Sequence, residues 1–182
     1  RSTIFPYTTL FRSRLPDLIF NILILSSIAS AFIPIYSKYL KEKGTKEARE
    51  LSQTAMTVAT SLVVICLVVM YFLMPLLMRA LVPSFNDLKR QETVELARFL
   101  LLSPLFFTLS YFLSGILNSH KHFLASSISP LLYNLSIILG VVLFADKIGV
   151  RGAAIGVVAG SFLHFAVQLP SALRLGFYPA LK

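Results

Sequence analysis

The chain has 182 residues, of which 56% are hydrophobic and only 14% are charged, and its mean hydropathy is +0.77. A soluble domain of this length needs far more polar surface to cover its core, so the composition excludes that class and indicates an integral membrane protein. The formal net charge of +9 does not indicate nucleic-acid binding, because the basic residues are spread over the connections between apolar segments. Membrane proteins that face anionic lipid carry such charge routinely.

The first 13 residues, Arg1–Ser13, stand apart from the rest of the chain. They resemble the in-frame translation of a common sequencing adapter, and no cleavage site of a signal peptide follows an apolar core there. We interpret this segment as non-native and expect residues 14–182 to carry the fold, with the chain truncated at both ends.

Five apolar segments follow, each long enough for a membrane span, which takes roughly 20 residues at about 1.5 Å per residue. We expect them as helices at about 18–40, 52–78, 94–118, 123–145 and 152–173. Strands of a membrane barrel would alternate apolar and polar residues over about ten positions, and these continuous runs are too long for that. The sequence therefore predicts an all-α, polytopic transmembrane bundle of about five helices.

The basic residues suggest an orientation in the membrane, because cytoplasmic loops carry an excess of Lys and Arg. The two sides of the predicted bundle hold eight and seven basic residues, so the totals barely differ. One side has Lys121, Arg174, Lys182 and a cluster in the first loop, and the other has Arg14, Arg79, Lys89, Arg90, Arg98, Lys147 and Arg151. The cluster of five, which we call the basic cluster, is predicted to lie in the cytoplasm: Lys38, Lys41, Lys43, Lys46 and Arg49.

Prolines interrupt the apolar runs. Four lie well inside a predicted helix and a fifth lies near the end of the last one: Pro34, Pro75, Pro104, Pro130 and Pro170. Each proline removes one backbone hydrogen bond and kinks its helix. Membrane helices tolerate this where neighbouring groups bind the freed carbonyl, so we expect kinked helices with such partners.

The fifth helix carries a stripe of small and polar residues at every fourth position: Gly152, Gly156, Gly160, His164 and Gln168. Residues four apart lie on one face of a helix. Glycines on such a face let a neighbouring backbone approach closely. We therefore predict that this stripe is a helix-packing face, with the histidine and glutamine bonded to a neighbouring helix rather than to substrate.

Polar side chains also share a face of the third helix, namely Ser103, Ser110, Ser114 and Asn118, and the fourth helix carries Asn134. Buried polar groups in a membrane face protein or water rather than lipid. They either line a cavity or bond between helices. The pattern leaves both alternatives open.

No catalytic or metal-binding motif occurs in the sequence. It holds no GxxxxGK[ST], HExxH or CxxC, and no Ser-His-Asp grouping in a loop. His120 and His122 flank Lys121 in a short link, which is a poor metal site and typical of an interfacial basic turn. We expect a non-enzyme without catalytic residues, metal or cofactor.

Three stretches resemble a known family, in matching order and spacing: RLPDLIFNIL…SAFIPIYSKYL at 14–40; the run 104–134 with GILN at 115–118 and SPLLYN at 129–134; and GAAIGVVAG at 152–160 followed by QLP at 168–170 and Gly176. They are similar to the MurJ/MviN lipid II flippases of the multidrug/oligosaccharidyl-lipid/polysaccharide exporter superfamily. The resemblance implies that the chain corresponds to roughly the second to sixth helix of a two-lobed protein of about fourteen helices.

The resemblance also implies a function. The family moves lipid II, an undecaprenyl-linked peptidoglycan precursor, across the bacterial cytoplasmic (inner) membrane by alternating access, coupled to membrane potential or an ion gradient. The expected partners are the lipid-linked glycan precursor and membrane lipids, with no nucleic acid. On this basis we expect a substrate path along six residues: Arg14, Asn21, Ser27, Ser110, Ser114 and Asn134.

One departure from the family pattern concerns the start of the first helix. Family members commonly carry arginine where this chain has Phe20 and Asn21, and an acidic-glycine step where it has Leu25, Ser26 and Ser27. The loss of positive charge keeps two other functions open. One is a flippase for another polyprenyl-linked glycan, of O-antigen or capsule type. The other is a non-transporting membrane scaffold of the same fold.

Overall fold

The computed structural model describes residues 26–178, and all structural statements refer to that part. Its helices are α2 (Ser26–Glu42), α3 (Thr45–Leu81), α4 (Asp87–Leu100), α5 (Leu102–Ser119), α6 (Phe123–Ile148), α7 (Val150–Ala166) and α8 (Leu169–Arg174). No strand occurs between residues 26 and 178. Arg14, Asn21 and the segment 1–13 lie outside the described residues, and Ser27 is placed only as part of the α2 backbone.

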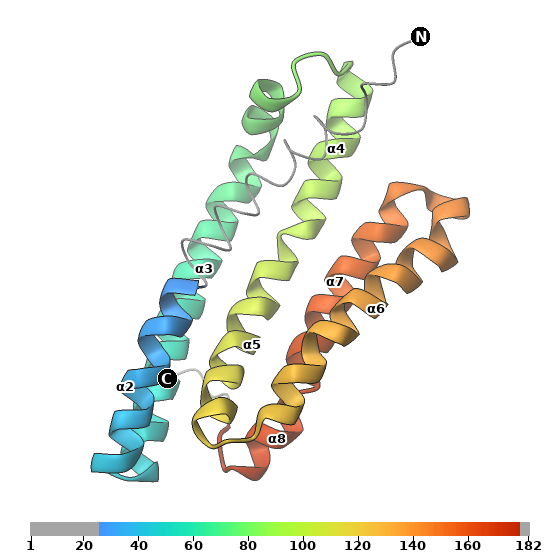
Figure 1. Cartoon of the computed structure of the whole chain (residues 1–182). Coiled ribbons are helices and arrows are strands. Elements are labelled where there is room, and N and C mark those ends of the chain that lie inside the picture. The colour runs from blue at the N-terminus through green and yellow to red at the C-terminus, as the bar shows by residue number, and fades with distance from the viewer. Residues whose placement is uncertain (1–25, 179–182) are drawn as a thin grey trace.

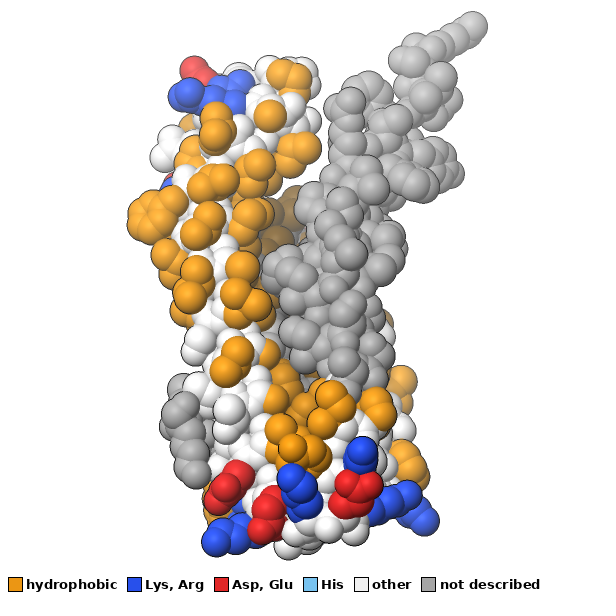
Figure 2. Space-filling model, turned by 90° about the vertical axis from the view of Figure 1, so that its left-hand side faces the viewer, with side chains coloured by type: hydrophobic (Ala, Val, Ile, Leu, Met, Phe, Trp, Pro, Cys, Tyr) orange, Lys and Arg blue, Asp and Glu red, His pale blue; other side chains and the backbone are white. Residues whose placement is uncertain are grey.

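Four helical stretches are long and apolar enough to cross a membrane. They are α3, α4 together with α5, α6, and α7 together with α8. The first predicted span, at 18–40, is described only from Ser26 onward, as α2. Figure 2 shows hydrophobic side chains along the length of one face and charged side chains gathered at its two ends. The prediction of an all-α transmembrane bundle is confirmed.

The helices form a bundle with α5 at its centre (Figure 1). The helices α2 and α3 lie on one side of α5, and the hairpin of α6 and α7 lies on the other. One end of the bundle holds the α2–α3 turn, the α5–α6 link and α8, and we call it the basic end. Most of the basic cluster, Lys121 and Arg174 lie there, as the alternation of short-linked helices requires.

Two helices begin before their apolar runs do. The prediction placed the second helix from 52 and the third from 94, whereas α3 starts at Thr45 and α4 at Asp87. An apolar run marks only the membrane-embedded part of a helix, whereas the helix itself can extend into the water with its backbone hydrogen bonds intact. With 37 residues, α3 is about 55 Å long. It therefore extends beyond a hydrocarbon core of about 30 Å.

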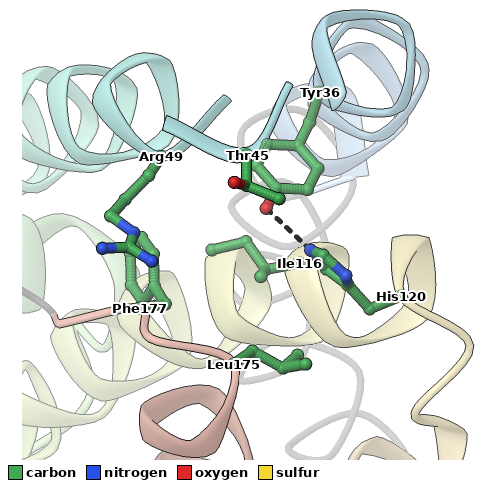
Figure 3. Close-up of a pocket in the computed structure, with 7 residues that line it drawn as sticks. All are labelled: Tyr36, Thr45, Arg49, Ile116, His120, Leu175 and Phe177. Atoms are coloured by element: carbon green, nitrogen blue, oxygen red, sulfur yellow. Dashed lines mark hydrogen bonds between the residues drawn. The ribbon is translucent and has the colours of Figure 1, made fainter. Parts of the chain in front are cut away.

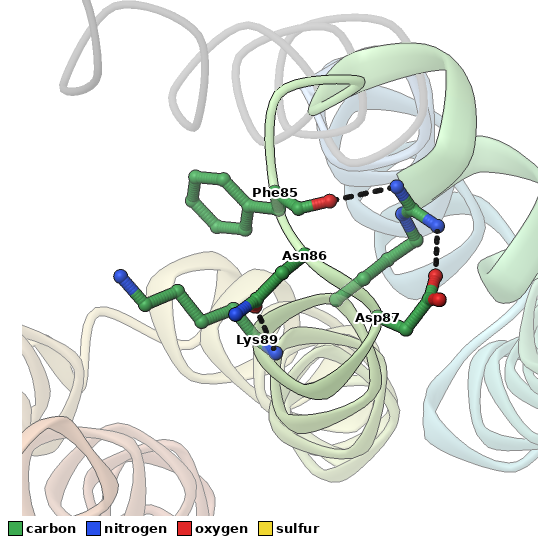
Figure 4. A network of polar contacts seen from close by, with 5 residues as sticks. Phe85, Asn86, Asp87 and Lys89 are labelled. Carbon is green, nitrogen blue, oxygen red and sulfur yellow. Dashed lines mark hydrogen bonds and ion pairs between the residues drawn. The ribbon is translucent and has the colours of Figure 1, made fainter.

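Local side-chain bonds fix the start of α4 (Figure 4). The Asn86 side chain accepts a hydrogen bond of 3.0 Å from the Lys89 backbone N–H and so caps the helix. Arg90 pairs with Asp87 at 2.8 Å and donates to the Phe85 carbonyl at 2.8 Å. These contacts let a polar segment of mixed charge begin the helix outside the apolar run.

Prolines break two of the predicted helices in two. Pro104 stands in the first turn of α5, where it cannot donate to the carbonyl of Leu100, and α4 ends at that residue. Pro170 starts α8 in the same way after α7 has ended at Ala166. The other three prolines, Pro34, Pro75 and Pro130, lie inside helices, as expected from the sequence.

The hairpin of α6 and α7 is held by backbone-to-backbone contact. A Cβ built at Gly152 would lie 2.8 Å from the Gly140 carbonyl, and one built at Gly156 would lie 2.7 Å from the Ser136 carbonyl. At Gly160 the nearest atom would be the Tyr133 carbonyl, at 2.8 Å. Real Cβ atoms do not occupy such positions, so the three glycines allow α7 to lie directly on the backbone of α6.

Arg98 binds the carbonyl that Pro75 leaves free in α3. Pro75 has no N–H to donate to the carbonyl four residues earlier, which belongs to Tyr71. The Nε of Arg98 donates to this carbonyl at 3.0 Å, and its guanidinium lies 4.3 Å from the centre of the Tyr71 ring. Arg98, on α4, thus satisfies the hydrogen bond that Pro75 leaves open in α3, and its charge lies against the Tyr71 ring.

We expect Arg98→Ala to lower the free energy of unfolding by about 2 kcal/mol, because a charged hydrogen bond and a cation–π contact are lost. In a Pro75→Ala background the new N–H can bond to the Tyr71 carbonyl, and Arg98→Ala should cost at least about 0.5 kcal/mol less. Denaturation of the four variants in mixed micelles measures this coupling. Arg79→Ala, which removes an exposed charge of α3, is the control and should show no coupling to Pro75.

Candidate functional site

A buried cluster of polar side chains joins α5 to α7 and α8. The Nε2 of Gln168 donates to the Ser110 hydroxyl at 2.5 Å and to the His164 carbonyl at 3.0 Å. Ser110 also lies 2.5 Å from Nδ1 of His164 and 3.0 Å from the carbonyl of the same residue. Ser114 donates to Oε1 of Gln168 at 2.7 Å. Four side chains thus satisfy one another's hydrogen bonds.

The cluster is dry. The side chains of Ser110 and Gln168 are 0% exposed, and His164 is 7% exposed. The rings of Phe107 and Tyr111 pack against the imidazole at centroid distances of 5.4 and 6.3 Å. Hydrogen bonds in such an apolar surrounding are stronger than in water, and a group that loses its partner there costs more. The arrangement links the α4–α5 span to the α7–α8 span.

Gln168 lies at the junction between α7 and α8, where the helix is interrupted ahead of Pro170. Its side chain returns to the carbonyl of His164, one turn earlier. The same amide group therefore bonds to the end of α7 and to α5. This position explains how a break in a membrane span is tolerated, because the side chain binds a carbonyl at the end of α7.

The structure brings together residues that the sequence assigned to two different roles. Ser110 and Ser114 were predicted on a substrate path, and His164 and Gln168 on a packing face; all four lie in one cluster. Asn134 is not part of it. It is exposed on α6 and donates to the Pro130 carbonyl of its own helix at 2.9 Å.

A second set of polar contacts lies at the basic end, between α2 and the end of α5. The Tyr36 hydroxyl lies 3.1 Å from Nε2 of His120, and Ser37 donates to Ser119 at 3.0 Å. Burial, and secondly the charge of neighbouring His122, lowers the pKa of His120 below its ordinary value. Sequence reasoning missed Tyr36 and Ser37, because nothing in an isolated helix indicates a partner 84 residues away.

No group of three or more metal-ligating side chains occurs between residues 26 and 178. The buried cluster offers hydroxyl, amide and imidazole groups that are already bonded to one another. As built, it holds two helices together.

Comparison with known families identifies the family of membrane proteins to which the chain belongs. The family described as "Lipid II flippase MurJ" matches residues 8–182, which is nearly the whole chain. The chain belongs to the lipid II flippase MurJ family. The resemblance stated from the motifs is thereby confirmed.

Individual relatives in the MurJ family agree with this. A probable lipid II flippase MurJ from Borreliella burgdorferi is 31% identical over 90% of this chain and 32% of its own length. The lipid II flippase MurJ from Thermosipho africanus is 30% identical over 84% of this chain and 31% of its own length. A probable lipid II flippase MurJ from Rhizobium tropici is 31% identical over 69% of this chain and 24% of its own length. The chain thus spans about a third of the length of the curated relatives it matches, or less.

As a MurJ family member, the chain is an integral membrane protein, and its relatives carry the name of a transporter rather than of an enzyme. The two sets of polar contacts, around Gln168 and around His120, have different surroundings. The cluster around Gln168 is enclosed between spans, whereas the contacts around His120 lie at the end of the bundle, next to the basic cluster.

Proposed function

We propose that this chain is part of a flippase that moves undecaprenyl-linked peptidoglycan precursor (lipid II) across the bacterial cytoplasmic membrane by alternating access. The match of the MurJ family to residues 8–182 carries this proposal. The chain covers about a third of the length of these relatives, which supports the proposal that it forms part of one lobe of a larger two-lobed transporter.

The physical properties of the bundle suit a body that moves as a unit. Alternating access in transporters is largely the rocking of one rigid bundle against another around a fixed site. Glycine contacts lock α6 to α7, and the buried cluster locks α7 to α5. A displacement of any one of these helices would therefore carry the other two along.

The substrate path remains part of the proposal. It would run along the six residues expected from the sequence: Arg14, Asn21, Ser27, Ser110, Ser114 and Asn134. The transport step involves no covalent chemistry, so we propose no catalytic residue and no cofactor. Coupling to membrane potential or an ion gradient would supply the driving force.

Phe20 and Asn21 favour keeping a second candidate, a flippase for another polyprenyl-linked glycan. Uncharged residues at these positions provide less attraction for a pyrophosphate group than the arginines common in the family. A non-transporting scaffold of the same fold is the third reading. The substrate specificity of the protein separates the three.

Expression of the gene in bacteria depleted of their own lipid II flippase tests the proposal. We expect the gene to restore growth and the cell shape of the depleted strain. A flippase for O-antigen units would instead restore surface glycan in a strain that lacks that transporter, and a scaffold would restore neither. No growth despite normal amounts of the protein in the membrane would refute the lipid II assignment.

A further inference from the structure

A pocket opens at the basic end of the bundle, where α2, α3, α5 and the segment after α8 meet (Figure 3). Its cavity volume is about 20 Å³. Seven residues line it: Tyr36, Thr45, Arg49, Ile116, His120, Leu175 and Phe177. This pocket is separate from the cluster around Gln168 and shares no residue with it.

Arg49 provides the positive charge of the pocket. Its half-buried side chain forms no ion pair with any residue between 26 and 178. The guanidinium lies over Gly176, because a Cβ built on that glycine would be 2.5 Å from Nη2 of Arg49. Gly176 has a φ of +72°, and its lack of a side chain leaves the space that the guanidinium fills.

The segment that supports Arg49 is itself tied to α3. The Nε2 of Gln53, one turn further along α3, donates to the Tyr178 carbonyl at 3.0 Å. Phe177 is 2% exposed and belongs to the core of this end of the bundle. The segment against which the guanidinium lies is therefore fixed to α3 by the fold.

Other polar groups lie around the same space. Thr45 contributes a hydroxyl from the first turn of α3, and the Tyr36 hydroxyl and the His120 ring, 3.1 Å apart, form the opposite side (Figure 3). Ile116 and Leu175 supply apolar walls. No carboxylate lines the pocket; Glu42, Glu47 and Glu50 are exposed residues of the same end.

We propose that this pocket binds a phosphate group. A guanidinium with free N–H groups matches the oxygens of phosphate in a bidentate manner. Hydroxyl and imidazole groups beside it supply further hydrogen bonds to oxygen. The pocket lies at the end of the bundle that bears the basic cluster, where the membrane meets water, so the phosphate group belongs either to a lipid headgroup or to a soluble anion.

Binding to the purified protein in detergent tests this proposal with three probes: inorganic phosphate, short-chain phosphatidylglycerol, and short-chain phosphatidylcholine as the lipid of zero net charge. We expect Arg49→Gln to weaken binding of the phosphate-bearing anion about tenfold, as loss of a charged hydrogen bond predicts. Lys46→Gln is the matched control, because it removes one positive charge from an exposed position of the same helix outside the pocket. It should change affinity less than about twofold.

The outcomes are distinct. Selective loss with Arg49→Gln supports the site, and the anionic probe that shows it, phosphatidylglycerol or inorganic phosphate, identifies the source of the phosphate group. Equal weakening by both variants would overturn the proposal, since binding would then follow net charge alone. A failure of both anions to bind would overturn it as well. If Arg49→Gln does not fold, Thr45→Val, at an exposed position, should still weaken binding about threefold through one lost hydrogen bond.

Discussion

Gly156→Leu is expected to force α6 and α7 apart and to lower the free energy of unfolding by about 3 kcal/mol or more. A Cβ at this position would meet the Ser136 carbonyl at 2.7 Å and the Ile137 Cα at 2.9 Å. Both atoms belong to the backbone, so no side-chain rotation can make room. The hydrogen bond of 2.9 Å from the Ser136 hydroxyl to the Gly156 carbonyl would be lost as well. Denaturation in mixed micelles measures the change.

Ala159→Leu is the control for this substitution. It adds a leucine to the same helix at an exposed position, so α7 gains a leucine side chain while the contact with α6 stays intact. We expect its effect on stability to remain within about 0.5 kcal/mol. Equal stability of the two variants would show that α7 does not lie on α6 as described.

The second large effect is expected at Gln168. Gln168→Leu keeps an apolar volume in the position but removes two hydrogen bonds donated by Nε2 and one accepted by Oε1. Ser110 and the His164 carbonyl lose a buried donor, while Ser114 loses its acceptor. We expect a loss of about 2–3 kcal/mol, because buried polar groups left without partners cost more than the bonds contribute. Thermal unfolding of the purified protein measures the loss.

Asn134→Leu provides the matched control, since it also replaces an amide by leucine. Its amide bonds only to the Pro130 carbonyl of its own helix and is exposed on the outside of α6. Stability should change by less than about 0.5 kcal/mol. A similar loss of stability in both variants would mean that the hydrogen bonds between α5 and α7 do not stabilise the protein more than an exposed amide does. Because Asn134 belongs to the proposed substrate path, transport is not the readout here.

Stability and transport are expected to be coupled through these two contacts. If α5, α6 and α7 move as one body, Gly156→Leu should reduce complementation of flippase-depleted cells even where protein remains in the membrane. Ala159→Leu should complement normally. The comparison requires equal protein amounts, determined on membrane fractions of both strains.

Composition and hydropathy were enough to predict the class of the protein and the approximate positions of its spans. A bilayer core admits only segments of about 20 apolar residues whose backbone bonds are satisfied internally, so long apolar runs have few alternatives. The glycine positions of α7 followed from the period of the helix, which places residues four apart on one face. Motif order then indicated the family, which the match to residues 8–182 confirmed.

Helix boundaries were predicted less well, because an apolar run marks only the part of a helix that lies in the hydrocarbon. A capped helix extends beyond that part into water, as α4 does at its start after Asn86. The effect of a proline also depends on its place in the helix. Pro75 lies inside α3, which continues past it, whereas Pro104 follows the point where α4 ends and α5 begins.

Which polar groups contact one another depends on how the helices pack in three dimensions. Periodicity shows which face a residue occupies and carries no information about what faces it. Ser110 finds His164 at a separation of 54 residues, Arg98 finds the Tyr71 carbonyl at 27, and Tyr36 finds His120 at 84. Each pairing follows from the packing of whole helices, because a buried donor or acceptor is satisfied by whichever neighbour the bundle brings within reach. The bilayer thus fixes the spans through local sequence, and the contacts between spans fix the sites.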